Sequence, residues 1–452
     1  MQSLRELSAS LQAFETTAVA LIETASERAK ASDSVFISIN EGLLDLAEVI
    51  DRGRKQKQST PALAGIPISL KDLFNVRNEM TLAGSVVRKH YAKPEARDAE
   101  VVAPLREAGL LFFGRTNMSE FAFSGMGKNP HYGTPLSIWD RQTGRLPGGS
   151  SSGSAVSVAE AIVTATLGSD TAGSCRIPAA FNGIVGVKPS YGRMSLTGIY
   201  PLSPTMDAPG PLANDVDSCF ILDQLMCGQA KPSDALPRLQ PKPVKSLRLV
   251  IPESGVMDGL DEEVQAAFEE ALETLRAAGA DISYAALPVL DQCIEFFATR
   301  AIALYDAWEH HREMLAQHGD EYDPFVRVRI AGGVSISEQE QQSRYRDIAS
   351  LGLEFARQYA QLDADAIIYP TVACVPPAIS ATLDFDDARA VNLKCLRNTA
   401  TANYFNGCSM SLPCHRPGQA PVGFMLSSTN GSDAELYRVA AAIEALLNAA
   451  RL

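Results

Sequence analysis

Residues 148–174 read GGSSSGSAVSVAEAIVTATLGSDTAGS. Two Gly/Ser-rich loops, 148–153 and 168–174, flank an apolar run in this stretch. The apolar run predicts a helix over 154–163, packed on both sides, and then a strand over 164–168. The first loop therefore precedes a helix, where free backbone amides and partial positive charge collect. A loop in that place either binds an anion or exposes a hydroxyl group.

The first loop allows other interpretations, of which a flexible connector is the commonest for its composition. A phosphate-binding loop is disfavoured, because no Lys-Ser or Lys-Thr pair follows. The loop also contains G-x-S-x-G, centred on Ser151, which matches the nucleophile elbow of α/β-hydrolases. That elbow needs a downstream acid and then a histidine base. We disfavour it, because no recognisable partner motif surrounds the downstream histidines His310, His311, His318 and His415.

The second loop has the composition of an oxyanion-binding turn, although a tight turn before a buried strand is an equal alternative from this segment alone. Small residues at Ala172 and Gly173 let the backbone approach a ligand closely. Successive amides of Thr171, Ala172, Gly173 and Ser174 are expected to converge on one oxygen, as in an oxyanion hole. Ser174 then lies where nucleophilic attack would take place.

Charged residues accompany the loops. Asp170 and Arg176 flank the second loop with opposite charges, and we expect an ion pair that braces it. Lys71 ends a predicted strand over 65–71. A lysine there is usually a surface residue with a buried stem. A buried one would have a lowered pKa and would serve as a base, and some serine hydrolases use lysine in place of histidine. The absence of S-x-x-K excludes the β-lactamase arrangement.

Bulk composition is that of a globular protein with a large core: 452 residues, 46% hydrophobic, with a net charge of −13. The acidic balance disfavours nucleic acid or an anionic membrane as the main partner. No run of about 18 apolar residues predicts a membrane span. The first 30 residues have the spacing of an amphipathic helix and lack the pattern of a secretory signal. We therefore expect a cytoplasmic protein.

Cysteine and histidine patterns do not indicate a metal centre. The eight cysteines include no C-x-x-C pair, and the six histidines include no H-E-x-x-H. Buried free thiols are the expected state of these cysteines. We predict no metal and no cofactor.

Strand-like runs alternate with helical patterns, which predicts an α/β protein. After a Pro- and Lys-rich connection over 228–246 the texture changes, and the second half is expected to cover the sheet and shape the pocket. The predicted strands are 65–71, 110–113, 164–168, 183–188, 247–251, 365–371 and 421–426, and the predicted helices are 98–109, 154–163, 261–279, 294–318, 337–360 and 434–447.

Several long motifs occur in a fixed order between residues 65 and 213. They are GIPISLKDLF around Lys71, GRTNMSEFAFSG from Gly114, PGGSSSGSA from Pro147, GSDTAGSCRIPAAFNGIVGVKPSYGR from Gly168 and GPLA from Gly210. Together they resemble the amidase signature family of serine hydrolases. Weaker agreement continues over 365–371, 398–413 and 421–426.

The resemblance implies a fold as well as an activity. The family fold is a layered α/β/α sandwich around a large central mixed β-sheet. On that basis we expect residues 1–452 to form a single domain. Residues 65–213 would be its catalytic core, and residues 245–452 would complete the sheet and shape the pocket. Homodimers are common in the family.

The resemblance also implies a Ser-Ser-Lys triad. Ser174 would be the nucleophile, Ser150 the relay after a cis peptide bond at Gly149, and Lys71 the base. The reaction would be hydrolysis of a carboxylic amide C–N bond in a small amide, ureide or acylated amine, through an acyl-enzyme. Ser152 and Ser169 would hold the loops by hydrogen bonds. No metal or organic cofactor takes part.

The chain departs from the commonest family pattern in two places. Ala172 and Cys175 vary the usual G-G-S-I, a variation that also occurs among urea-derivative hydrolases, and Leu73-Phe74 replaces the Asn-containing K-D-N. Two alternative activities remain: the glutaminase component of a tRNA-dependent amidotransferase, and an allophanate or carboxybiuret hydrolase. A catalytically silent binding protein would require a broken triad, and all three residues are present.

Substrate choice is expected to depend on residues 118–132 and 200–206 and on the second half of the chain. Met118, Phe123 and Tyr132 are the candidate substrate-binding residues. Arg176 is an alternative partner for a substrate carboxylate, although its bracing role is favoured.

Overall fold

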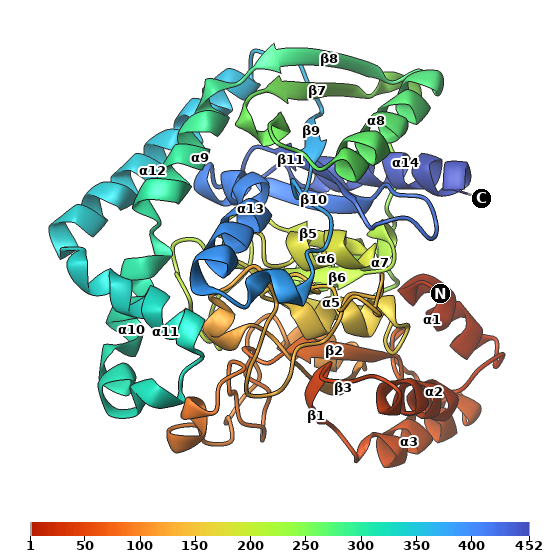
Figure 1. Ribbon diagram of the computed structural model, residues 1–452. Helices are drawn as coiled ribbons and strands as arrows, with labels where there is room; N and C mark the ends of the chain where they lie inside the picture. The colour runs from red at the N-terminus through yellow and green to blue at the C-terminus, as the bar shows by residue number, and fades with distance from the viewer. Residues whose placement is uncertain (1, 452) are drawn as a thin grey trace.

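The computed structural model describes residues 2–451, which form a sheet of eleven strands (Figure 1). The strands are β1 (Phe36–Ile39), β2 (Pro67–Lys71), β3 (Leu111–Thr116), β4 (Ala165–Asp170), β5 (Val185–Lys188), β6 (Ala208–Ala213), β7 (Arg248–Glu253), β8 (Asp281–Ala286), β9 (Ala366–Pro370), β10 (Cys408–Pro413) and β11 (Gly423–Ser428). Their order across the sheet is β1-β3-β2-β4-β6-β5-β10-β11-β9-β7-β8.

The sheet is mixed. β2 pairs in parallel with both β3 and β4, and β7 pairs in parallel with β8 and β9. The strands between these two groups pair antiparallel. Because β2 and β4 are parallel neighbours, their carboxyl ends, Lys71 and Asp170, lie at the same edge of the sheet.

The helices are α1 (Leu4–Gln12), α2 (Ala18–Lys30), α3 (Leu43–Lys55), α4 (Ala103–Glu107), α5 (Ser152–Ala159), α6 (Arg176–Asn182), α7 (Val216–Met226), α8 (Glu262–Ala277), α9 (Pro288–Arg300), α10 (Ala303–His318), α11 (Pro324–Ala331), α12 (Glu338–Tyr359), α13 (Phe385–Tyr404) and α14 (Asp433–Arg451). Among the described residues none of these helices is long and apolar enough to cross a membrane.

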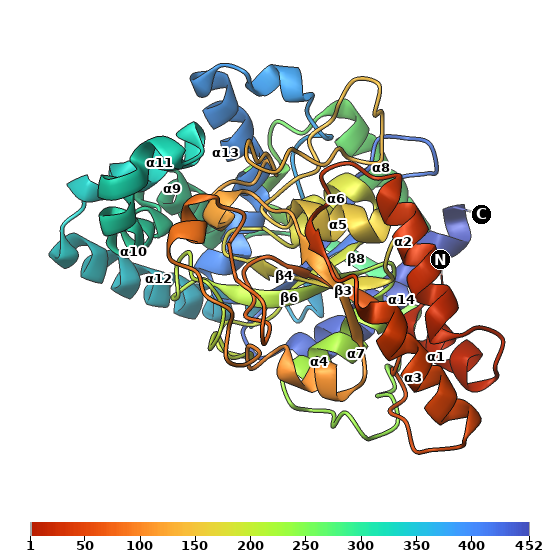
Figure 2. The same ribbon diagram turned by 90° about the horizontal axis from the view of Figure 1, so that it is seen from below.

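The helices cover both faces of the sheet, as the view from below shows (Figure 2). α1, α4, α7, α8 and α14 share one apolar cluster on one face. α5 lies on the other face, as do α6, α9, α12 and α13. Alternation along β11 follows this division, because Phe424 and Leu426 enter the first cluster while Met425 enters the second. The predicted layered α/β fold with a mixed sheet is confirmed.

Most predicted elements are present, with shifted ends. The helix expected over 98–109 is wrong in length, because only α4 is helical there. The pattern over 294–318 belongs to two helices, α9 and α10, separated at residues 301–302. The amphipathic N-terminal stretch likewise divides into α1 and α2. Between the second loop and β5 the chain forms α6, which the sequence analysis did not predict.

Two short buried helices, α5 and α6, follow the two Gly/Ser-rich loops. Both are built of small or apolar residues that permit close packing. α6 approaches β5 most closely at Gly186, where an added Cβ would lie 2.5 Å from the carbonyl oxygen of Cys175. The same Cβ would lie 2.5 Å from the Cβ of Ala179. The absent side chain at Gly186 therefore sets the distance between α6 and the sheet.

We predict that Gly186→Ala lowers the free energy of unfolding by about 1–3 kcal/mol, because the methyl group overpacks this contact. The shift of α6 should also reduce activity, since Cys175 is adjacent to Ser174. Urea denaturation measures the first effect and steady-state kinetics the second. The control is Gly332→Ala, where nothing lies within 4 Å of the added Cβ. Equal stability of the two variants would contradict the prediction.

Candidate active site

Lys71 meets both Gly/Ser-rich loops at the carboxyl edge of β2. Its amine nitrogen Nζ lies 2.7 Å from Ser150 Oγ and 2.8 Å from Ser169 Oγ. The side chain is completely buried. The peptide bond between Gly149 and Ser150 is cis. The structure therefore places Lys71 and Ser150 in direct hydrogen-bond contact.

Burial also changes the proton affinity of this amine. Loss of hydration lowers the pKa of Lys71 to about 8, against the opposing attraction of nearby Asp170 and Asp207. No carboxylate is within ion-pair distance of its nitrogen among residues 2–451. The amine therefore has a substantial neutral fraction near pH 8, which is the form that accepts a proton.

Ser174 lies in the turn between β4 and α6. The backbone amide of Ser151 donates to the Ser174 carbonyl at 3.2 Å, so the two loops are hydrogen-bonded to each other. The Ser174 side chain lines a pocket, and no protein group that the structure describes accepts from or donates to its hydroxyl. The hydroxyl is thus presented to whatever enters that pocket.

The predicted ion pair between Asp170 and Arg176 is present and is completely buried. Arg176 donates to the carboxylate twice, from Nε at 3.0 Å and from Nη2 at 2.9 Å. Asn403 of α13 donates to the same carboxylate at 3.0 Å. Burial alone would raise the pKa of Asp170, but these donors hold it at about 2.

Asp170 also accepts from the turn that contains Ser174. The Gly173 amide donates to it at 2.8 Å and the Cys175 amide at 3.1 Å. The prediction that Gly173 contributes its amide to an oxyanion hole is therefore wrong for this conformation, because that N–H already has a charged acceptor. The amides of Thr171, Ala172 and Ser174 remain available.

The rest of the turn is held from two directions. The Thr171 hydroxyl donates to Asp207 at 2.5 Å. Asp207 in turn accepts from the amides of Leu202 and Ser203, so it ties the turn to the 200–206 segment. On the other side, the Thr399 hydroxyl donates to the Ala172 carbonyl at 2.8 Å. These contacts fix the backbone around Ser174.

The pocket in front of Ser174 encloses about 490 Å³ of space between atoms. Residues of both halves of the chain line it. From the first half come Phe123, Thr171, Ala172, Leu202 and Met206, and from the second Phe297, Ala301, Ala303, Arg329, Leu396 and Tyr404. The lining is apolar apart from Thr171, Ser174 and Arg329, together with a few backbone and hydroxyl groups.

Comparison with known proteins decides the family. The sequence profile described as Amidase matches residues 18–437. The chain belongs to the Amidase family. It is 32% identical over 452 residues to the 2-amino-5-chloromuconic acid deaminase of Comamonas testosteroni, covering 98% of this chain and 96% of that protein.

Other relatives of this amidase agree. It is 30% identical to the first component of the glutamyl-tRNA(Gln) amidotransferase of Syntrophus aciditrophicus (strain SB), covering 98% of this chain and 96% of that protein. A crystal structure of an amidase superposes with a TM-score of 0.87 at 32% identity, covering 98% and 99% of the two chains. The protein is thus an enzyme that hydrolyses amide C–N bonds, and the predicted family is confirmed.

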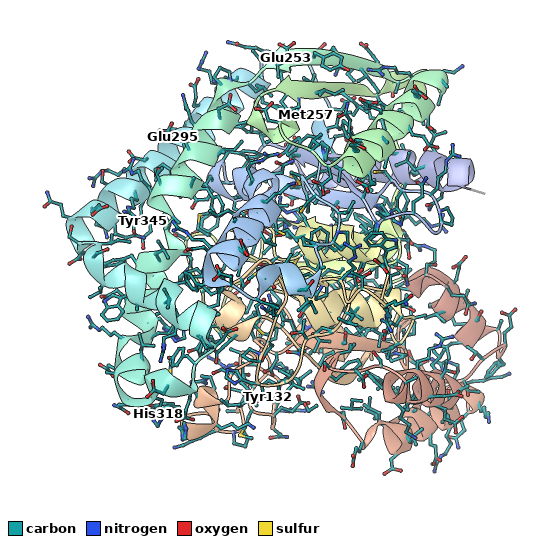
Figure 3. The ribbon with its side chains drawn as sticks, in the orientation of Figure 1. Tyr132, Glu253, Met257, Glu295, His318 and Tyr345 are labelled. Atoms are coloured by element: carbon teal, nitrogen blue, oxygen red, sulfur yellow. The ribbon has the colours of Figure 1, made fainter. Side chains whose placement is uncertain are left out.

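Two of the three predicted substrate-binding residues do not line the pocket of this amidase. Only Phe123 does. Met118 is completely buried, because it packs behind the turn at Gly84. Tyr132 lines a separate hollow against β1 and β3, and Figure 3 labels it near the lower edge of the molecule. Arg176 is completely buried against Asp170 and has no access to a substrate.

The supporting serines behave as loop residues. Ser169 Oγ is the second partner of Lys71 Nζ, and Ser152 Oγ donates to the Asn117 carbonyl at 3.5 Å. Ser151, the centre of the elbow-like motif, donates to the Ser169 carbonyl at 3.4 Å instead of facing the pocket. Asn403, Thr399 and Arg329 were missed, since no local pattern connects α11 and α13 with a turn more than 150 residues earlier.

We predict that Asp170→Asn lowers the free energy of unfolding by about 3–5 kcal/mol, because it leaves the buried Arg176 guanidinium without its counter-charge. Chemical denaturation measures this loss. The matched control is Asp320→Asn at the exposed Asp320–Arg327 pair, where the cost should stay below about 1 kcal/mol. Similar losses in the two variants would show that the buried pair does not brace the loop.

Proposed function

We propose that the amidase acts through an acyl-enzyme on Ser174, with Ser150 as the proton relay and Lys71 as the base. The observation that carries the proposal is the buried Lys71 amine at 2.7 Å from Ser150 Oγ, beside a pocket that Ser174 lines. A serine hydroxyl is a weak nucleophile until a base takes its proton. A neutral lysine next to a second serine supplies that base.

The reaction would proceed in balanced steps. Ser150 takes the proton of Ser174 while giving its own to Lys71, and Ser174 Oγ bonds to the amide carbon. The resulting oxyanion accepts hydrogen bonds from amides of the 171–174 turn. The C–N bond then breaks as the relay returns the proton to the leaving nitrogen. Water attacks the ester by the same route and releases the acid and free Ser174.

We further propose that the substrate carries a carboxylate. Arg329 of α11 lines the pocket with its guanidinium over the Phe123 ring, 4.4 Å from Cζ to the ring centroid. No side chain that the structure describes forms an ion pair or hydrogen bond with it, and its Nε is buried without a partner. A buried arginine without a counter-charge is costly, which an anionic substrate would offset.

The electrostatics of the pocket support this assignment. Burial and the neighbouring Arg389 lower the pKa of Arg329 to about 10, so the guanidinium remains charged at neutral pH. Both arginines are positive within a chain of net charge −13. A planar guanidinium binds a carboxylate through two parallel hydrogen bonds. The relative from Comamonas testosteroni is also named for an acid.

The glutaminase component of an amidotransferase is the second candidate, supported by full-length similarity to such a protein. Glutamine also carries a carboxylate, so Arg329 suits either activity. The two differ in what the isolated chain does. A free-standing amidase releases ammonia or an amine from a small amide without any other protein, whereas an amidotransferase component requires its partner chains. An allophanate-type hydrolase would also suit Arg329 and is tested by adding allophanate to the same assay.

We also infer that the chain acts as one domain, because a single sheet takes strands from both 65–213 and 245–452. A cytoplasmic location is supported by eight free cysteines, a state typical of reducing compartments. The homodimer and the lack of a nucleic-acid partner stay predictions.

We predict that Ser174→Ala abolishes turnover of every accepted amide while leaving the folded structure intact. Mass spectrometry of the wild-type enzyme quenched during turnover should find the acyl group on the peptide containing Ser174. Ser151→Ala is the matched control in the neighbouring loop and should retain most activity. Turnover by Ser174→Ala, or an adduct on Ser151, would contradict the proposed nucleophile.

For the substrate class, we predict that Arg329→Met lowers kcat/KM for an amide with a terminal carboxylate, such as succinamate, by roughly 10- to 100-fold. The estimate follows from about 1.5–3 kcal/mol for hydrogen bonds to a charged group. The loss should appear mainly in KM. Butyramide, which lacks the carboxylate, serves as the control substrate and should be hydrolysed equally by both enzymes. Equal losses for the two substrates would overturn the carboxylate assignment.

A further inference from the structure

A second group of ionisable side chains lies outside the Ser174 pocket, where two histidines meet one glutamate. His90 Nε2 lies 2.9 Å from Glu321 Oε2, and His318 Nδ1 lies 2.8 Å from Glu321 Oε1. His90 ends a 3-10 turn at Val87–His90, whereas His318 is the last residue of α10. Figure 3 labels His318 at the lower left of the molecule.

The three side chains form the one cluster with metal-ligand geometry among residues 2–451. Their ligand atoms all lie within 4.8 Å of one another. The two imidazole rings are stacked, with centroids 4.1 Å apart and planes 13° from parallel. Each therefore directs a nitrogen at a different oxygen of the same carboxylate. A single surface ion pair would need one of these histidines, not both.

We propose that His90, His318 and Glu321 form a binding site for a divalent transition metal, with Zn²⁺ as the best match. Zn²⁺ prefers imidazole nitrogen and carboxylate oxygen, and three protein ligands plus one water complete its tetrahedron. The hard cations Ca²⁺ and Mg²⁺ prefer oxygen ligands and do not suit two imidazoles. The site lies outside the hydrolytic pocket and takes no part in the acyl-enzyme chemistry.

The observed geometry is close to that of a loaded site. Tetrahedral Zn²⁺ with bonds of about 2.0–2.1 Å holds its ligand atoms about 3.4 Å apart. The two histidine–glutamate distances must therefore open by about 0.5 Å around the ion. The stacked rings must also tilt, because each imidazole lone pair lies in its ring plane. Solvent-exposed side chains permit this rotation, and His90 and Glu321 are each 44% exposed.

A bound ion would join two segments that are 231 residues apart in sequence. The first segment, 72–98, follows Lys71 directly. The second contains α10, which leads into α11 and Arg329. Tyr91 and Gln317 already share a hydrogen bond of 2.9 Å across the same junction. The ion would add a coordinate link at this place and stabilise the docking of α10 and α11 on the first half of the chain.

The test is calorimetric titration of the chelator-treated, full-length protein with ZnCl₂. We expect one Zn²⁺ per chain and a higher Tm in its presence. His318→Ala and Glu321→Gln should each weaken binding at least tenfold and remove the Tm shift. Glu309→Gln, at an exposed acid on the same helix, is the matched control and should bind as the wild type does.

Titration with Co²⁺ identifies the ligand atoms. A site of two imidazoles and a carboxylate gives visible d–d bands without thiolate charge-transfer absorption. No stoichiometric binding of either ion would overturn the proposal. So would binding that survives in both His318→Ala and Glu321→Gln, or thiolate absorption, since each would place the metal elsewhere on the chain. All these readouts are independent of amide hydrolysis.

Discussion

The removal of the Lys71 amine from water is the constraint on which the site depends. β2 carries this side chain into the interior, where two serine hydroxyls are its hydrogen-bond partners. Desolvation lowers its pKa to about 8, because no carboxylate pairs with it closely enough to offset the lost hydration. A carboxylate in direct contact would hold the lysine protonated and useless as a base. Instead, the nearby negative charge of Asp170 is paired with Arg176.

The two halves of the chain contribute differently to this arrangement. Residues before position 210 provide the groups assigned to bond making and proton transfer, on two loops at one edge of the sheet. Residues after 245 hold those loops in place and define what fits. Asn403 and Thr399 on α13 reach the turn around Ser174, and Arg329 on α11 adds the charge in the pocket. Specificity can therefore change in α11 without disturbing the proton relay.

Local sequence patterns predicted the loops, the strand that ends at Lys71 and the Asp170–Arg176 pair, because each depends on residues close together in the chain. The resemblance to a family supplied the relay role of Ser150, which no spacing rule provides. What failed depended on tertiary packing. Gly173 was assigned to the oxyanion hole because composition does not show that its amide faces Asp170. Met118 and Tyr132 were placed in the pocket because they lie near a motif, but nearness in sequence does not determine which way a side chain packs. Arg329 was missed because its role rests on the absence of a counter-charge, which only the fold reveals.

The pH dependence of acylation tests the central claim most directly. With a neutral Lys71 as the base, kcat/KM should rise about tenfold per pH unit below pH 8 and level off above it, following the pKa of about 8. The amine is protonated, and therefore inactive, on the acid side of that value. Lys71→Ala should lose most activity, and the activity that remains should no longer show this inflection. A wild-type profile that is flat between pH 6 and 9, or an unchanged inflection in Lys71→Ala, would contradict the account.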